Sequence, residues 1–137
     1  MARGNVPGAA ALLAAGIGVL CYHLGSDRLD FAAHYVAGLG GTMLLLSLVT
    51  ILPPALPRSW AALAVTALSC GIGAGCEALI FVEGGFDLVD VSNQSLGAVT
   101  AGLIFVSWPV NGAVAVAVWI LLALAFLGGG ACLVGTW

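Results

Sequence analysis

The sequence predicts an all-α integral membrane protein, a bundle of about five transmembrane helices, and three observations support this prediction. The 137 residues are 62% hydrophobic and only 7% charged. Their mean hydropathy of +1.18 is well above that of a soluble domain. The apolar residues form continuous runs, several of which reach the roughly 20 residues that a helix needs to cross a bilayer. The length fits a single transmembrane helical domain over residues 1–137.

Five apolar runs follow one another, separated by short segments that contain charged residues, glycine or proline. The predicted spans cover residues 8–24, 30–52, 60–82, 90–108 and 113–134. Proline cannot continue a helix, so Pro53, Pro54 and Pro57 end the second span. Glycine permits sharp turns, which we expect at Gly84–Gly85 and at residues 109–112. The first run resembles a signal peptide, but we expect it to remain as a span.

Small residues in the third span predict a packing surface. Gly71 and Gly75 lie one helical turn apart in the pattern Gly-x-x-x-Gly, which lets two helix backbones approach each other closely in a membrane. We therefore expect this span to pack against a neighbouring helix through these two glycines.

The arginines predict the topology and exclude one class of partner. With five spans, Arg3 and Arg58 lie on one side of the membrane and Arg28 lies on the other. The positive-inside rule then places the N-terminus in the cytoplasm. Three basic residues and a net charge of −3 cannot form a basic surface for nucleic acid, so we expect no nucleic-acid partner.

Polar residues gather at one end of the predicted bundle. Two crossings separate the turn after the first span from the connection after the third, so both lie on the same side of the membrane. The candidate polar site at this end consists of Asp30, His34, Glu77, Asp87, Asp90 and Gln94. Glu83 and the last three of these residues recur three or four positions apart, which places them on one helix face. We expect His34 and Glu77 to meet, because they lie at similar depth on neighbouring helices.

Two interpretations of this site need no bound cofactor. In the first, His34 pairs with Glu77, while Asp87 and Asp90 cap the fourth helix, where carboxylates are favoured. In the second, the histidine and carboxylates act as general acid and base on an envelope lipid. Arg28 is the only nearby cation, and no nucleophile lies beside a base, so the sequence favours a protein that is not an enzyme.

Two further interpretations involve a ligand. Oxygen-rich sites bind divalent cations, and the ligands in this case would be Asp87, Asp90, Glu83 and His34. Because the sequence contains no known metal-binding spacing, we predict no metal site. The cofactor is otherwise unknown. Pigment or haem ligation by His23 or His34 stays open, since Gly38, one turn after His34, leaves room for a flat ring.

The order of the polar residues carries a family resemblance. Asp30-x-x-x-His34 opens one span, Glu77 lies late in the next, and Asp87-x-x-Asp90 with Gly97 opens another. This pattern, over roughly residues 30–103, resembles the VanZ-like family of small bacterial membrane proteins. It departs from the family at Phe31 and Ile80, where a basic residue and a glutamine are usual. The resemblance implies a helical fold in the bacterial cytoplasmic (inner) membrane and a link to the cell envelope and to glycopeptide (teicoplanin) resistance.

The spans are rich in glycine and alanine, and the segments between them are short. Flat helix surfaces of this kind suit contact with other helices. We therefore expect a non-catalytic accessory or structural subunit that packs, within the lipid bilayer, against the subunits of a larger membrane protein complex. The alternative is a VanZ-like cell-envelope protein that handles a lipid or glycopeptide-related ligand at the candidate polar site.

Overall fold

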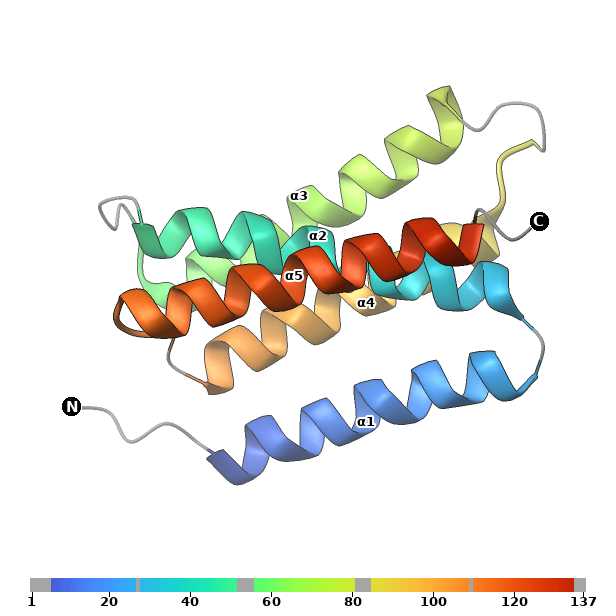
Figure 1. Ribbon diagram of the computed structural model, residues 1–137. Coiled ribbons are helices and arrows are strands. Elements are labelled where there is room, and N and C mark those ends of the chain that lie inside the picture. Colours follow the sequence, from blue (N-terminus) through green and yellow to red (C-terminus); the bar gives the residue numbers. More distant parts are fainter. Residues whose placement is uncertain (1–5, 27, 52–55, 81–84, 109, 135–137) are drawn as a thin grey trace.

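The computed structural model contains five helices and, over the residues that it describes, no strand (Figure 1). The described residues are 6–26, 28–51, 56–80, 85–108 and 110–134. The helices are α1 (Val6–Gly25), α2 (Leu29–Ile51), α3 (Arg58–Leu79), α4 (Leu88–Ser107) and α5 (Ala113–Val134). The predicted all-helical class is confirmed. Gly85 and Gly112 have φ angles of +77° and +83°, as expected of glycines that turn the chain.

Within the residues that the structure describes, four of the helices are long and apolar enough to cross a membrane. These are α2, α3, α4 and α5, whose candidate spans are between 20 and 23 residues long. At 1.5 Å per residue, such helices match a hydrocarbon layer of about 30 Å. In α1 the corresponding apolar stretch is shorter and covers Ala10–Gly25. The structure thus has the shape and composition of a helical membrane protein.

The central helix is α2, which packs against α4 and α5 (Figure 1). Two glycines permit these contacts. A Cβ added at Gly38 would overlap the backbone carbonyl of Gln94 on α4. One added at Gly40 would lie 2.7 Å from the carbonyl oxygen of Ala123 on α5. Because residues two positions apart point in nearly opposite directions on a helix, the glycines admit α4 and α5 from opposite sides.

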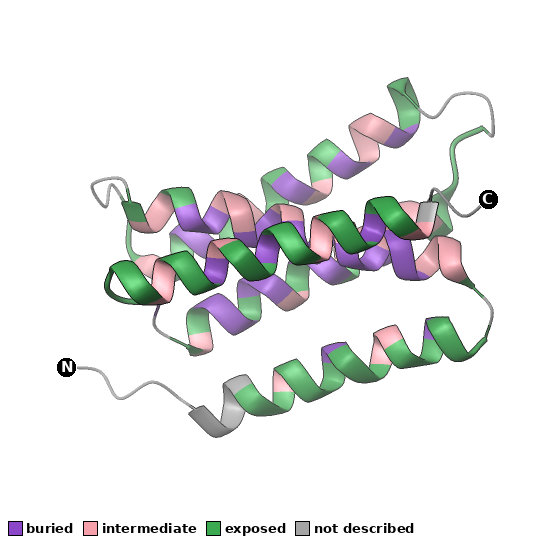
Figure 2. Ribbon diagram, in the orientation of Figure 1, coloured by how far each residue is buried: buried purple, intermediate pink, exposed green. Residues whose placement is uncertain are grey.

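Each of the two helices contributes a glycine to the contact between α2 and α4. A Cβ added at Gly97 on α4 would overlap the carbonyl of Tyr35 and lie 2.7 Å from the amide nitrogen of Leu39. The two helix backbones therefore touch, as they do where small residues meet in membrane proteins. Figure 2 shows the resulting burial, which is densest on α2 and least on the outward faces of α1 and α5.

The glycine of α3 that contacts a neighbouring helix is Gly73. A Cβ there would overlap the side chain of Gln94. Nothing lies within 4 Å of a Cβ built at Gly71 or at Gly75. Among the described residues these two glycines contact no other helix, because they lie on the face of α3 that points away from α4, and their packing against a helix stays a prediction.

At the end of the bundle where α3 begins, Arg58 caps the C-terminal end of α4. Its guanidinium donates to the carbonyl of Phe105 at 3.1 Å from Nε and to that of Trp108 at 3.0 Å. It also lies 3.9 Å from the centre of the Phe105 ring. Carbonyls in the last turn of a helix have no partner within it, and a cation there is favoured by the helix dipole. The side chain thus ties the start of α3 to the end of α4.

Two substitutions in α2 test the glycine contact. We expect Gly38→Ala to destabilise the folded protein by about 1–3 kcal/mol or more, because the added methyl group forces α4 away from α2. Gly41→Ala is the matched control: nothing lies within 4 Å of a Cβ at that position. Its stability should be equal or slightly higher, since alanine favours helix. Unfolding in detergent micelles measures both, and an equal loss in the two variants would contradict the contact.

Candidate functional site

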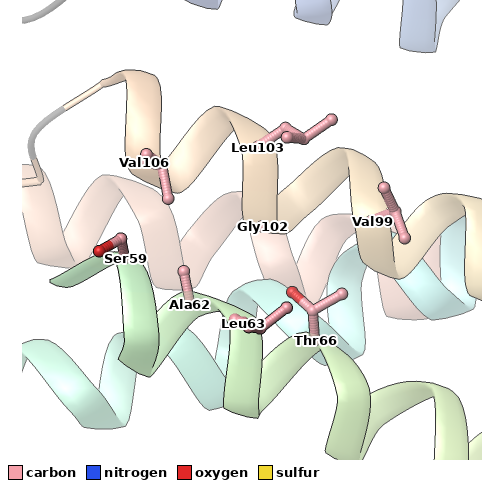
Figure 3. A pocket seen from close by; sticks show the side chains of 8 residues that line it. All are labelled: Ser59, Ala62, Leu63, Thr66, Val99, Gly102, Leu103 and Val106. Atoms are coloured by element: carbon pink, nitrogen blue, oxygen red, sulfur yellow. The ribbon is translucent and has the colours of Figure 1, made fainter. Parts of the chain in front are cut away.

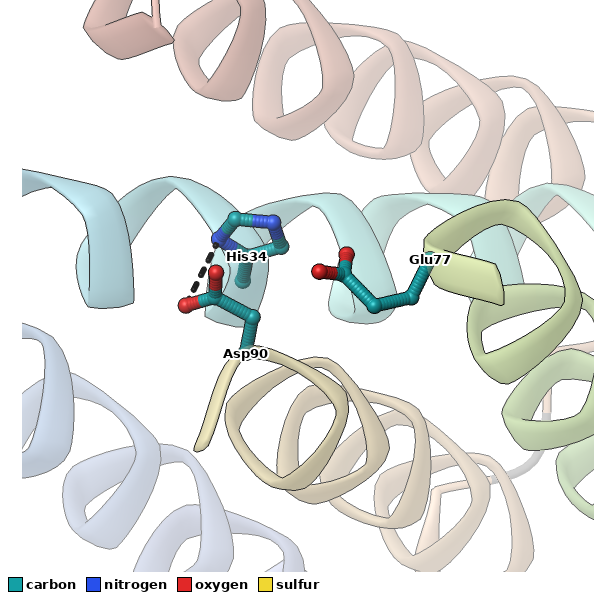
Figure 4. Close-up of side chains that lie close together, drawn as sticks. All are labelled: His34, Glu77 and Asp90. Atoms are coloured by element: carbon teal, nitrogen blue, oxygen red, sulfur yellow. Dashed lines mark ion pairs between the residues drawn. The ribbon is translucent and has the colours of Figure 1, made fainter. Parts of the chain in front are cut away.

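Three of the six candidate residues come together at the end of the bundle where α2 and α4 begin and α3 ends. They are His34 on α2, Glu77 on α3 and Asp90 on α4, called the polar cluster below. Figure 4 shows their side chains pointing toward one another from three helices. One nitrogen or oxygen atom from each lies within 4.8 Å of those from the other two. His34 and Glu77 therefore share a site, and Asp90 completes it.

His34 is oriented by the first turn of its own helix. Its Nδ1 lies 2.9 Å from the carbonyl oxygen of Asp30 and 3.4 Å from Oδ1 of Asp90. The Asp30 carbonyl can only accept, which favours the tautomer that carries its hydrogen on Nδ1, and the 3.4 Å approach to Asp90 is an ion-pair contact rather than a hydrogen bond. In that tautomer Nε2 keeps a lone pair.

Glu77 is the most buried member of the polar cluster, with 7% of its surface exposed. Its Oε1 accepts a hydrogen bond from the backbone amide of Asp87 at 3.2 Å. The Asp87 side chain turns the other way and accepts from the amide of Val89 at 2.7 Å, as the N-cap of α4. Asp87 is thus a capping residue that supplies only its backbone to the site. Glu83 lies outside the described residues.

Asp30 and Gln94 lie beside the polar cluster. The Asp30 carboxylate pairs with Arg28 at 3.5 Å, and only its backbone carbonyl reaches His34. Gln94 lies one turn deeper than Asp90 on α4, where its side chain covers Gly73. The glycine makes room for a polar side chain between α3 and α4.

A buried hydroxyl pair, which the sequence reasoning missed, lies deeper still. Thr42 on α2 donates to Oγ of Ser69 on α3 at 2.6 Å, and both residues are buried. The available signal was helical spacing, because Thr42 follows His34 by two steps of four residues and Ser69 precedes Glu77 by the same two steps. The hydrogen bond lets two polar side chains lie inside the bundle at low cost.

The polar cluster has more negative than positive charge. Two carboxylates face one imidazole, and the chain contains no lysine. Of the described arginines, Arg28 pairs with Asp30, and Arg58 lies at the opposite end of the bundle. Oδ1 of Asp90 is buried and accepts no hydrogen bond, and its recorded contact is the one with His34 at 3.4 Å. A site of this charge suits a cation better than an anion.

The second histidine lies elsewhere. His23, on α1, is buried between the edges of Tyr22 and Phe31, and neither ring nitrogen has a hydrogen-bond partner among the described residues. The expectation that Gly38 leaves room for a flat ring beside His34 is wrong, because the carbonyl of Gln94 fills that space. The polar cluster combines three side chains of metal-binding types, and of the four ligands considered from the sequence it includes His34 and Asp90, whereas Asp87 caps α4.

A groove of about 270 Å³ opens between the first half of α3 and the second half of α4 (Figure 3). It is lined by Ser59, Ala62, Leu63, Thr66, Val99, Gly102, Leu103 and Val106. Its walls are mainly apolar and carry no charged side chain, so it suits a hydrocarbon chain better than a polar substrate.

No protein-family model, curated protein or solved structure matches this chain.

Proposed function

We propose that this chain is a five-span protein of the bacterial cytoplasmic membrane and serves as a non-catalytic accessory subunit of a larger membrane protein complex. One observation carries the proposal. Ala67, Gly71 and Gly75 recur every four residues along α3 and form an open stripe. Within the described residues, nothing outside the backbone of α3 itself lies within 4 Å of a Cβ at either glycine.

The occupant that fits this stripe is a transmembrane helix of a partner protein. Lipid tails gain nothing from a flat surface, whereas a second helix gains close backbone contact and van der Waals packing. The neighbouring side chains on α3 are large and apolar: Leu68 is 57% exposed and Ile72 is 48% exposed. A groove of small residues flanked by larger ones accepts the side chains of a facing helix.

The topology belongs to the same proposal. α1 is 20 residues long and supplies the fifth span. Five spans leave Arg3 and Arg58 on one side and Arg28 on the other, which favours an N-terminus in the cytoplasm. The polar cluster then faces away from the cytoplasm.

Cysteine labelling tests this orientation. In a chain whose four free cysteines are replaced by alanine, Phe86→Cys should react with a membrane-impermeant thiol reagent in intact cells. Phe86 is exposed, and its use avoids the positive φ of Gly85, which a side chain would strain. Asn111→Cys, in the turn before α5, is the control and should react only in broken cells. The reverse pattern would refute the orientation.

Filling the stripe with large side chains tests the accessory role. The double variant Gly71→Leu/Gly75→Leu should keep the fold, because both positions are open, and lose the partner. Native electrophoresis of the protein, extracted in mild detergent from its own membrane, should show a defined larger complex that the variant lacks. Gly128→Leu is the matched control on α5, where a Cβ also meets nothing within 4 Å. Migration of the wild type as a monomer, or as a dimer of itself, would count against the proposal.

The polar cluster favours a second candidate function. The side chains of His34 and Asp90 are 24% and 19% exposed, so a ligand in the headgroup region can reach them. The alternative is a VanZ-like envelope protein that handles a lipid or a glycopeptide-related ligand at this cluster.

Complementation separates this candidate from the accessory role. Cells that lack the protein should become more sensitive to teicoplanin. The wild type and the Gly71→Leu/Gly75→Leu variant should restore resistance, and Asp90→Asn should not. Unchanged sensitivity in cells without the protein would remove this candidate.

A further inference from the structure

The polar cluster has the composition and the spacing of a metal site. His34, Glu77 and Asp90 come from three helices, and their ligand atoms lie within 4.8 Å of one another. Ligand atoms around a Zn²⁺ ion with bonds of about 2.1 Å lie roughly 3–3.5 Å apart. Small side-chain rotations therefore suffice to close the three groups around an ion.

The unbalanced charge is an independent indication of a cation. Glu77 is 7% exposed, and among the described residues its carboxylate accepts one hydrogen bond, from the Asp87 amide to Oε1. Oδ1 of Asp90 is buried without a hydrogen bond. Two carboxylates this close repel each other, and burial in a bilayer increases the cost. A divalent cation neutralises both charges, whereas a protonated His34 neutralises only one.

The structure also positions the imidazole as a metal-binding histidine is usually positioned. With its hydrogen on Nδ1, which lies 2.9 Å from the Asp30 carbonyl and 3.4 Å from Oδ1 of Asp90, His34 keeps the lone pair of Nε2 for an ion, and Asp90 turns from Nδ1 toward that ion to bind it. Histidine ligands commonly donate their other N–H to a carbonyl or carboxylate, which fixes the ring. The Asp87 amide orients Glu77 in the same way.

We infer that His34, Glu77 and Asp90 bind one divalent transition-metal ion of the Zn²⁺ or Mn²⁺ class. One imidazole nitrogen with two carboxylates favours these ions over Ca²⁺ and Mg²⁺, which prefer oxygen ligands alone. Three protein ligands leave at least one coordination position open to water or to a small ligand. The site lies on a different face of α3 from Gly71 and Gly75, so it is independent of the accessory role.

The test is metal binding by the purified, untagged full-length chain in detergent. After treatment with a chelator, equilibrium dialysis against ZnCl₂ or MnCl₂ should restore one ion per chain, with little competition from an excess of MgCl₂. Glu77→Gln, Asp90→Asn and His34→Gln should each weaken binding at least tenfold. Glu77→Gln keeps an oxygen for the Asp87 amide, so its fold should survive.

Asp87→Asn is the matched control, because asparagine caps a helix as well as aspartate does. It removes a nearby carboxylate but no ligand, and its affinity should stay within about threefold of the wild type. Substitution with Co²⁺ provides a second readout, since its visible absorption reports the ligands directly. Absence of binding to the wild type would overturn the inference. Binding that survives all three ligand variants, or an equal loss in Asp87→Asn, would overturn it as well.

Discussion

The backbone contact between α2 and α4 sets the geometry of the bundle. Gly38 and Gly97 let the two helices touch at one level, and any side chain there would separate them. Both helices begin at the same end, so the contact also fixes how their first turns face each other. His34 lies one turn before Gly38, and Asp90 lies one turn before Gln94, the residue that Gly38 meets. The polar cluster is therefore a consequence of this crossing as much as of its own residues.

The third helix is attached by polar contacts rather than by glycines that touch a backbone. Glu77 accepts from the Asp87 amide, Ser69 accepts from Thr42, and Arg58 donates to the last carbonyls of α4. In a bilayer, apolar side chains contact lipid about as favourably as they contact another helix. The polar contacts therefore help to determine the position of a helix in the bundle. They are spread along the whole length of α3, from its first residue to its last turn.

Composition and charge placement predict the helical class, the approximate positions of the five helices and the end of the bundle at which polar residues gather, because each follows from the alternation of apolar runs and turns. They do not predict how each helix is rotated about its own axis, and so which of its faces is buried. A membrane helix is apolar nearly all round, so its periodicity is too weak to show which face is buried. The spacing of Gly71 and Gly75 therefore does not show that Gly73, between them, is the glycine that contacts Gln94. The sequence likewise leaves open whether Asp87 caps the fourth helix or enters the site, and in the structure it is the N-cap of α4.

Charged side chains are compensated to different extents at the two ends of the bundle, and this difference distinguishes the polar cluster. At one end, the Arg58 cation is satisfied by carbonyls that would otherwise lack partners. At the other, the N-terminal turn of α4 offers a partial positive charge to Asp90, but this is only a fraction of one unit. From the part of the chain that the structure describes, Glu77 receives one amide hydrogen bond in compensation. Asp30 has Arg28 beside it, and Asp87 is exposed and caps α4 through the Val89 amide. Glu77 and Asp90 differ in that they lie together against one imidazole, with no arginine paired to either among the described residues.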